Sequence, residues 1–151
     1  MAEIAVRPAS PGDGEFVWEC RNDPAARAVS RSVEPIPLAD HLAWFTARLE
    51  RSETRFLIVE AAGEPAGYVR FERGDVETEI SIALAPKARG RGVGSQAIRA
   101  AAEAEAEQHT APIAAYVKED NTASLAAFRR AGFDDDTVSE GLHRLVFTGR
   151  E

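Results

Sequence analysis

The residues from Arg89 to Ser95 carry the strongest chemical signal in the sequence. They read Arg-Gly-Arg-Gly-Val-Gly-Ser, with glycine at every second position. Alternate glycines let the backbone approach a ligand closely and turn successive N–H groups toward it, and a helix that begins here adds partial positive charge. Two arginines add full charges. We therefore predict an anion-binding loop made of Arg89, Gly90, Arg91, Gly92, Val93, Gly94 and Ser95.

Two common phosphate-binding motifs do not account for this loop. A Walker A loop would continue with Gly-Lys-Ser or Gly-Lys-Thr, and the dinucleotide fingerprint needs a G-x-G-x-x-G spacing; neither is present. A glycine-rich turn decorated with basic residues is the alternative interpretation. The position of the segment, after a predicted strand and before a predicted helix, favours the binding loop.

Two helical segments in the first third of the chain each carry a polar and aromatic face beside an apolar face. The polar and aromatic residues recur at helical spacing and are Trp18, Arg21 and Asn22 in the first segment and His41, Trp44 and Arg48 in the second. Aromatic and arginine side chains suit a uracil ring and a diphosphate, through stacking and paired hydrogen bonds. The alternative is that the tryptophans cap the core and the arginines are solvated.

Length and composition restrict the kind of protein. A chain of 151 residues is expected to form one domain, here 1–151. The formal net charge of −7 argues against nucleic-acid binding, and no apolar run reaches the ~20 residues of a membrane span. Cys20 is the single cysteine and no ligand cluster surrounds His41, so we expect no metal. The N-terminal residues do not resemble a secretion signal, and we expect a cytoplasmic protein.

The elements that must position these residues follow from periodicity and turn signals. Strands are predicted at 4–6, 54–62, 66–73, 77–85, 113–118 and 142–147. Helices are predicted from Ser10 onward and at 38–51, 92–109 and 122–131. Three consecutive strands followed by alternating helices and strands indicate a mixed α/β sheet.

Apolar periodicity also predicts which faces are buried. In the helix at 38–51, an apolar stripe should face the core and consists of Leu38, Leu42, Phe45 and Leu49. In the strand at 77–85, Ile80, Ile82 and Leu84 should lie on one face, and Glu79, Ser81 and Ala83 on the other.

The sequence resembles the GNAT superfamily of acyl-CoA-dependent N-acyltransferases in two separate motifs. Arg89, Gly92 and Gly94 fill the family's Gln/Arg-x-x-Gly-x-Gly/Ala loop, and the segment 119–133 matches a later family segment. The resemblance implies a single-domain α/β fold with a sheet of six to seven strands, splayed between the fourth and fifth strands, and about four helices. It implies acetyl-CoA as cofactor, bound by the backbone of Ile82, Ala83 and Leu84, by the Arg89 loop, and by Asn121, Ser124 and Phe128. Helix capping is an alternative role for Asn121 and Ser124.

The same resemblance implies catalytic roles. Glu79 lies where such enzymes often carry the carboxylate that takes the amine proton, and Glu77 is its competitor on the same face. The family's usual proton donor to the departing thiol is a tyrosine, but this chain has Phe128 at that position. A phenyl ring cannot donate a proton, which leaves Tyr116, Ser81 or water as substitutes.

The N-terminal third narrows the expected acceptor. The segments 18–24 and 41–45 resemble the GNAT branch that acetylates 4-amino-sugar nucleotides in pseudaminic acid biosynthesis and, more weakly, the ribosomal-protein N-terminal acetyltransferases. We therefore expect acetyl transfer to a primary amine, favour a UDP-linked amino sugar, and expect Ser81 to contact it beside the residues of the two polar faces. A protein or peptide N-terminus and a non-catalytic acyl-CoA-binding domain are the alternatives. A homodimer is an open possibility.

Overall fold

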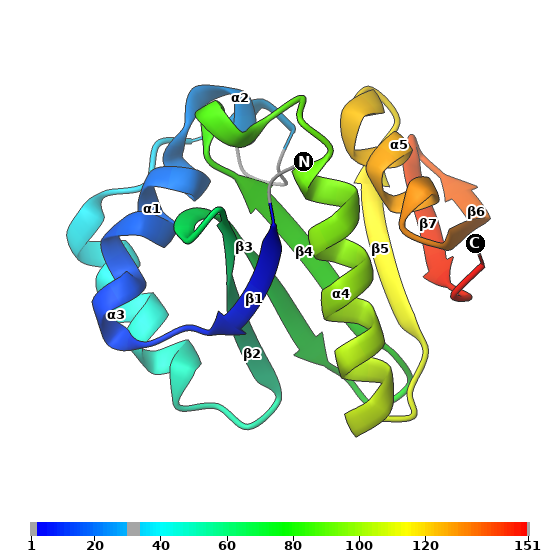
Figure 1. The fold of residues 1–151 in the computed structure, drawn as a ribbon, viewed down its shortest axis with the longest axis horizontal. Helices are drawn as coiled ribbons and strands as arrows, with labels where there is room; N and C mark the ends of the chain where they lie inside the picture. The colour runs from blue at the N-terminus through cyan, green and yellow to red at the C-terminus, as the bar shows by residue number, and fades with distance from the viewer. Residues whose placement is uncertain (1–2, 30–33, 151) are drawn as a thin grey trace.

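Seven strands form one mixed sheet in the computed structural model, which describes residues 3–29 and 34–150 (Figure 1). The strand order is β1-β2-β3-β4-β5-β7-β6, and within it the β4–β5 pair is parallel while the others are antiparallel. The strands are β1 (Ile4–Pro8), β2 (Thr54–Ala61), β3 (Glu64–Arg73), β4 (Thr78–Leu84), β5 (Ile113–Lys118), β6 (Phe133–Ser139) and β7 (Leu142–Phe147).

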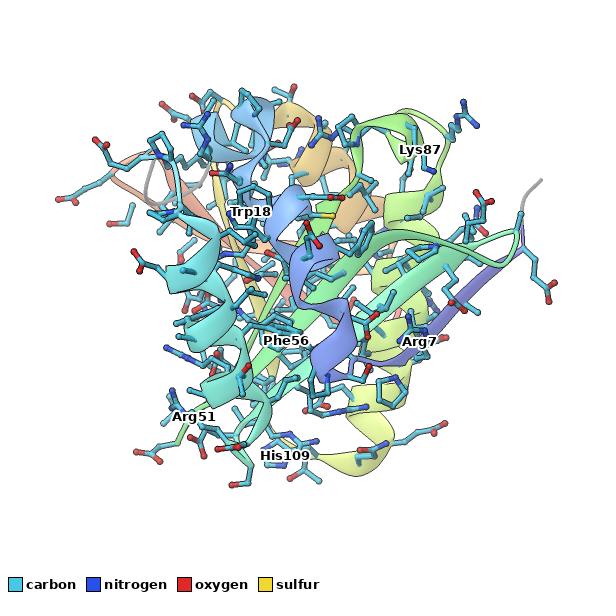
Figure 2. The ribbon with its side chains drawn as sticks, turned by 90° about the vertical axis from the view of Figure 1, so that its left-hand side faces the viewer. Arg7, Trp18, Arg51, Phe56, Lys87 and His109 are labelled. Carbon is cyan, nitrogen blue, oxygen red and sulfur yellow. The ribbon has the colours of Figure 1, made fainter. Side chains whose placement is uncertain are left out.

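Helices cover both faces of the sheet. On one face lie α1 (Gly14–Asn22) and α3 (Leu38–Leu49), joined by way of the short α2 (Pro24–Val29). On the other face lie α4 (Val93–Gln108) and α5 (Thr122–Arg130). Figure 2 looks onto the α1 and α3 side, with Phe56 of the sheet labelled between the two helices. This layering gives the α/β fold that was expected.

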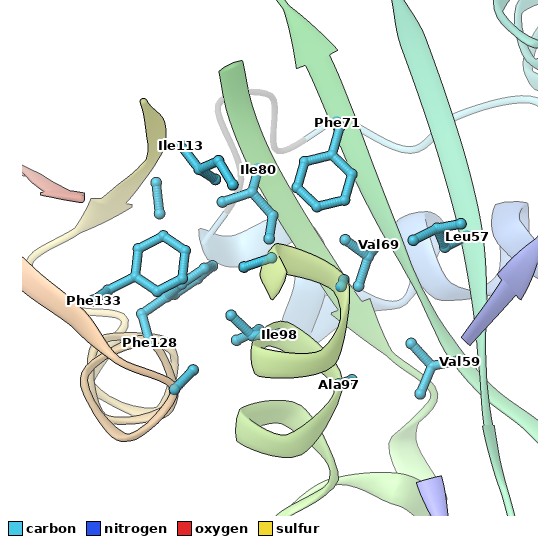
Figure 3. Close-up of a cluster of buried hydrophobic side chains, with 14 of the residues drawn as sticks. Leu57, Val59, Val69, Phe71, Ile80, Ala97, Ile98, Ile113, Phe128 and Phe133 are labelled. Atoms are coloured by element: carbon cyan, nitrogen blue, oxygen red, sulfur yellow. The ribbon is translucent and has the colours of Figure 1, made fainter. Parts of the chain in front are cut away.

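Two hydrophobic clusters correspond to the two faces. The larger cluster joins β2 to β5 with α4 and α5, and Figure 3 shows Ile80, Ile98, Phe128 and Phe133 within it. The smaller cluster lies under α1 and α3 and is built on Phe45, Phe56 and Tyr68. The predicted alternation of β4 is confirmed, because Ile80, Ile82 and Leu84 pack in the larger cluster and Ala83 packs against the smaller one.

The sheet splits between β4 and β5, as the family resemblance implied. The parallel ladder holds at Thr78 opposite Ile113 and at Glu79 opposite Ala114, and no further pair joins the two strands. Figure 1 shows them close at this end and apart at the other, beside the first turn of α4. A gap opened in this way exposes strand edges that would otherwise be paired.

A buried ion cluster ties α4 to the sheet on its far side from the split. Glu105 of α4 is fully buried and accepts hydrogen bonds from Arg55 of β2 at 2.5 Å and from Arg73 of β3 at 2.8 Å. Burial alone would raise the pKa of the Glu105 carboxyl, but the two guanidinium groups outweigh it and lower that pKa. The cluster fixes the helix whose N-terminus follows the glycine loop.

The predicted buried face of α3 is confirmed at Phe45 and Leu49 but is wrong at Leu42. His41 is 1% exposed and Phe45 is 1% exposed, whereas Leu42 is 38% exposed. The helix is rotated because α3 packs closely on α1 at Gly14, where Nε2 of His41 donates to the Gly14 carbonyl oxygen at 2.9 Å. His41, with its hydrogen bond satisfied, is therefore buried at a position outside the predicted stripe, and its neighbour Leu42 is exposed.

Two elements were not predicted from the residues. The pattern gave six strands, but β6 pairs with β7 in an antiparallel hairpin although its sequence contains three consecutive aspartates. Aspartate is disfavoured in strands, which hid this edge strand. The first predicted helix is divided at Asp23 into α1 and α2, because Pro24 follows. Within the described residues, no helix is long and apolar enough to cross a membrane.

Candidate active site

The edge of β4 that faces the split carries unpaired backbone groups. The Ala85 N–H donates to the Ala66 carbonyl at 2.8 Å, so alternation along the antiparallel β3–β4 ladder turns the backbone groups of Ile80, Ile82 and Leu84 toward β5. The β5 ladder does not reach Ile82 or Leu84. The strand edge can therefore bond the amides of an extended ligand, as was expected for Ile82, Ala83 and Leu84, although Ala83 itself turns its backbone groups to β3.

The glycine loop takes a left-handed backbone conformation at two of its three glycines. Gly90 and Gly92 both have φ of +75°, a left-handed conformation that side chains disfavour, and Gly92 is the N-cap of α4. A Cβ at Gly90 would meet no atom within 4 Å. The N–H groups of Val93, Gly94 and Ser95 belong to the first turn of α4 and have no carbonyl partner within the helix. These features fit a pyrophosphate group.

Arg89 uses its charge inside the protein. Its Nη2 donates to Oδ2 of Asp23 at 2.9 Å and to the Leu84 carbonyl at 3.1 Å. The guanidinium therefore links the end of β4 with the start of α2. Arg91, in contrast, is exposed within the loop and adds positive charge beside the α4 N-terminus.

The later family segment forms the start and body of α5. Oδ1 of Asn121 accepts from the Ser124 N–H at 3.2 Å, which is the capping arrangement that was the alternative role for these residues. Phe128 is 2% exposed in the core, with its ring edge-on to Phe133 at a centroid separation of 5.0 Å. The buried ring faces the apolar cluster between α4 and α5. It offers no exposed surface for the cofactor contact that the resemblance implied.

Glu79 and Ser81 lie on the sheet face opposite α4. Glu79 stands at the last β4–β5 pair, where the split begins, and is partly exposed. In the β3–β4 ladder, Glu79 lies opposite Glu72 of β3 and Ser81 lies opposite Arg70 of β3. The candidate base is therefore at the closed end of the split, on the face that also carries the polar side chains of α1 and α3.

Glu77, the competing base, is held in a hydrogen-bonded network. It accepts from the Tyr116 hydroxyl of β5 and from Nη2 of Arg144 of β7 at 2.6 Å. Burial would raise the pKa of the Glu77 carboxyl, but these two hydrogen bonds outweigh it and lower that pKa. The bond to Glu77 also raises the pKa of Tyr116. Both groups are poorer proton carriers than their positions suggested, and the network bridges β4 to β5 and β7 beside the split.

The predicted acceptor residues separate into two sets. Nε1 of Trp18 donates to the Ile36 carbonyl at 2.7 Å, and Oδ1 of Asn22 accepts from the Ile36 N–H at 2.8 Å. These two side chains hold the chain that leads into α3. Arg21 and Trp44 form the other set, with the Arg21 guanidinium 4.2 Å from the centroid of the Trp44 indole.

His41 orients the Arg21 side chain through a hydrogen bond. Its pKa is lowered by burial and by the neighbouring Arg21 charge, so the ring is neutral at pH 7. Because Nε2 carries the proton given to Gly14, Nδ1 accepts from Nη1 of Arg21 at 2.9 Å. His41 is 1% exposed and therefore acts on the site through Arg21.

Three neighbours of this site were not among the predicted site residues. Arg70 and Glu72 extend the polar face of β3, and Asp23 anchors Arg89. Alternation along the predicted strand at 66–73 places Arg70 on the same face as Tyr68, and this signal could have identified it. Cys20 is 1% exposed, and burial raises its pKa to about 12, so the thiol has no nucleophilic role.

Comparison with known families identifies this arrangement. The sequence matches the acetyltransferase (GNAT) domain family over residues 3–134. The chain belongs to the GNAT family. It is a GNAT-type acetyltransferase, an enzyme class that uses acetyl-CoA, and the GNAT fold accounts for the split sheet and for the glycine loop at the α4 N-terminus.

Solved structures share the fold at low sequence identity. Spermidine N-acetyltransferase from Vibrio cholerae, in complex with CoA and spermine, is 16% identical with a TM-score of 0.83, covering 97% of this chain and 96% of that one. Aminoglycoside acetyltransferase AAC(6')-Ib in complex with coenzyme A is 20% identical with a TM-score of 0.79, covering 95% and 94%. The putative acetyltransferase yncA from Salmonella typhimurium, with acetyl-CoA, is 22% identical with a TM-score of 0.77, covering 98% and 95%. A search of curated proteins finds no match.

Proposed function

We propose that this GNAT enzyme acetylates the primary amine of a nucleotide-linked amino sugar, with Glu79 as the general base. The observation that carries the proposal is that the Arg21 and Trp44 pair lies on the same face of the sheet as Glu79 and Ser81. An indole can stack on a nucleobase and a guanidinium can pair with a diphosphate.

Amide formation needs a neutral amine and a path for its proton. Acetyl-CoA supplies an activated acetyl thioester. As the amine nitrogen bonds to the carbonyl carbon and the carbon–sulfur bond breaks, Glu79 accepts the amine proton directly or through a water. The departing thiolate is protonated by water, either directly or through the Ser81 hydroxyl, which regains its proton from water, because Tyr116 is already bonded to Glu77 and Phe128 has no proton to give.

The acidity of the acceptor amine favours a sugar amine over a lysine-like amine. An amine of pKa ~10.4 costs roughly 4–5 kcal/mol to deprotonate at pH 7, whereas an amine near 8 costs about 1 kcal/mol. An amino sugar resembles the second case. The Glu79 carboxylate at the closed end of the split is then sufficient as the base, and no strong desolvation of the amine is required.

Thiol release with a panel of amines tests the proposal. We expect a UDP-linked 4-amino-4,6-dideoxy sugar to be acetylated with a higher kcat/KM than alanyl or seryl peptides or spermidine at equal concentration. Trp44→Ala and Arg21→Ala should lower kcat/KM for the nucleotide sugar and change it little for a minimal amine. A preference for peptides, or an equal loss for every amine, would contradict the proposed acceptor.

A further inference from the structure

We infer that Arg70 is the centre of an anion-binding subsite that it forms with Arg21 and Arg48 around the Trp44 indole, and that this subsite holds a phosphate group of the acceptor. The inference rests on the proposed function, because it assigns the charged part of that acceptor to named residues. Arg70 is one strand away from the candidate base and pairs across the sheet with Ser81.

Three guanidinium groups surround one aromatic ring. The guanidinium carbons of Arg21, Arg48 and Arg70 lie 4.2, 5.4 and 5.7 Å from the centroid of the Trp44 indole. Cation–π attraction accommodates such groups, but it does not remove the repulsion among three like charges. An anion brought between them would relieve that repulsion.

One carboxylate offsets part of this charge. Glu72 accepts from Nη1 of Arg48 at 2.7 Å and from the Thr54 hydroxyl at 2.8 Å. Nε of Arg70 is 4.0 Å from Oε1 of Glu72, which is within ion-pair distance but beyond hydrogen-bond distance. Three arginines against Glu72 leave a formal charge of +2, or +1 when Glu79, opposite Glu72 on β4, is included. In the part of the chain that the structure describes, no carboxylate is hydrogen-bonded to Arg21 or Arg70.

The Arg70 side chain has an unused donor. Its Nε is buried and has no hydrogen-bond partner among the residues described. Buried donors in native proteins are nearly always satisfied, so an unpaired charged donor indicates a missing acceptor. A phosphate oxygen fits, because guanidinium groups present several N–H donors in one plane and pair with phosphate in two-point contacts.

The environment of Arg21 agrees with this assignment. Burial lowers the pKa of Arg21, and the charges of Arg70 and Arg48 lower it further, while the neutral His41 ring only orients it. The fold therefore holds a partly desolvated cation beside two others on the acceptor side. This electrostatic field disfavours cationic acceptors such as polyamines and favours anionic ones.

Anion binding in the presence of coenzyme A tests the subsite directly. Saturating coenzyme A occupies the glycine loop, so added inorganic pyrophosphate or UDP then reports on the second site. We expect calorimetry to show that both bind the wild-type complex with an affinity that falls as salt rises, and that uridine without phosphate binds more weakly.

The decisive variant is Arg70→Gln, with Arg51→Gln as the matched control. Arg51 follows α3, is paired with Glu53 and is not among the guanidinium groups over Trp44. Its replacement by glutamine removes the same single positive charge. Arg70→Gln should weaken pyrophosphate binding by about tenfold or more, Arg70→Lys by less, and Arg51→Gln by less than about twofold. Arg70→Gln loses the contact with Trp44 and the ion pair with Glu72, but it also removes the repulsion with Arg21, so the melting temperature should change little.

The outcomes separate this inference from the proposed function. The subsite is wrong if Arg70→Gln binds pyrophosphate as tightly as the wild type. It is also wrong if Arg70→Gln loses binding only because it unfolds and the folded Arg70→Lys variant still binds normally at higher salt. If pyrophosphate binding depends on Arg70 but UDP-linked amino sugars are not acetylated, the subsite stands and the proposed acceptor is wrong.

Discussion

Asp23 and Arg89 form an ion pair, 2.9 Å between Oδ2 and Nη2, that connects the junction of α1 and α2 to the loop in front of α4. The same Asp23 oxygen accepts from the N–H groups of Ala25 and Ala26 at the start of α2. One carboxylate thus joins the α1–α2 junction to the glycine loop, which lies far from it in the sequence.

Two substitutions separate the roles of Asp23. Asparagine retains the helix cap but loses the charge, whereas alanine loses both, so Asp23→Ala should be less stable than Asp23→Asn by about 1 kcal/mol in urea unfolding. Equal stabilities would show that the bonds to Ala25 and Ala26 contribute nothing.

The stability of the wild type relative to Asp23→Asn should depend on pH. Burial would raise the pKa of Asp23, but the bond to Arg89 and the backbone N–H bonds outweigh it and lower that pKa below its unfolded value. The charged carboxylate therefore stabilises the fold fully above the unfolded pKa of about 3.9, and this contribution is lost as pH falls through the folded value. Unfolding of both proteins from pH 7 to pH 2.5 measures the difference, which should shrink only at the acid end. A difference that grows on acidification would contradict the ion pair.

Gly92 offers a test of cofactor placement with a matched control. Gly63, in the β2–β3 turn, also has a positive φ, +81° against +75° for Gly92, and a Cβ there would meet no atom within 4 Å. Gly92→Trp and Gly63→Trp should therefore lose similar stability, about 1–2 kcal/mol, from the left-handed backbone.

Binding should distinguish the two variants. Coenzyme A affinity, measured by calorimetry, should be abolished in Gly92→Trp and unchanged in Gly63→Trp, with native circular dichroism spectra for both. Tight binding by Gly92→Trp would remove the pyrophosphate from this loop.

Phe128→Tyr should not improve the enzyme. The ring is 2% exposed among apolar residues, so an added hydroxyl would be buried without an evident partner and should cost about 1–3 kcal/mol of stability. Thiol departure is not limiting in the proposed reaction, so kcat should change by less than about tenfold. Steady-state kinetics at saturating acetyl-CoA measures this. A gain of about a hundredfold or more would show that the natural chain lacks a needed acid.

Much of the scaffold was predictable because it follows local patterns. The strands at 113–118 and 142–147 have the predicted bounds, and α4 differs from the prediction by one residue at each end. Alternation along β4 gave the correct faces, since a strand buried on one side must alternate. The predicted strands at 54–62 and 66–73 form β2 and β3, but the turn between them is tighter than the predicted gap because Ala62 and Gly63 both have positive φ.

The acceptor side was harder to predict because its contacts are between elements. Spacing on α1 grouped Trp18 and Asn22 with Arg21, but only the tertiary path of the chain brings Ile36 to the first two and Trp44 to the third. The rotation of α3 that buries His41 depends on Gly14 of another helix. No periodicity within one helix contains that information.

The most direct test of the account is the activity of Glu79→Gln. Glutamine keeps the shape of the side chain but cannot accept the amine proton, so kcat for the UDP-linked amino sugar should fall by roughly 10²–10⁴-fold, while the coenzyme A affinity measured by calorimetry stays unchanged. Glu77→Gln removes a charge from the network with Tyr116 and Arg144. It should therefore lower the stability of the fold and change kcat little. A kcat for Glu79→Gln within about threefold of the wild type would be well short of the loss expected for a general base. In that case Glu79 is not the base, and the reaction is not organised at the closed end of the split.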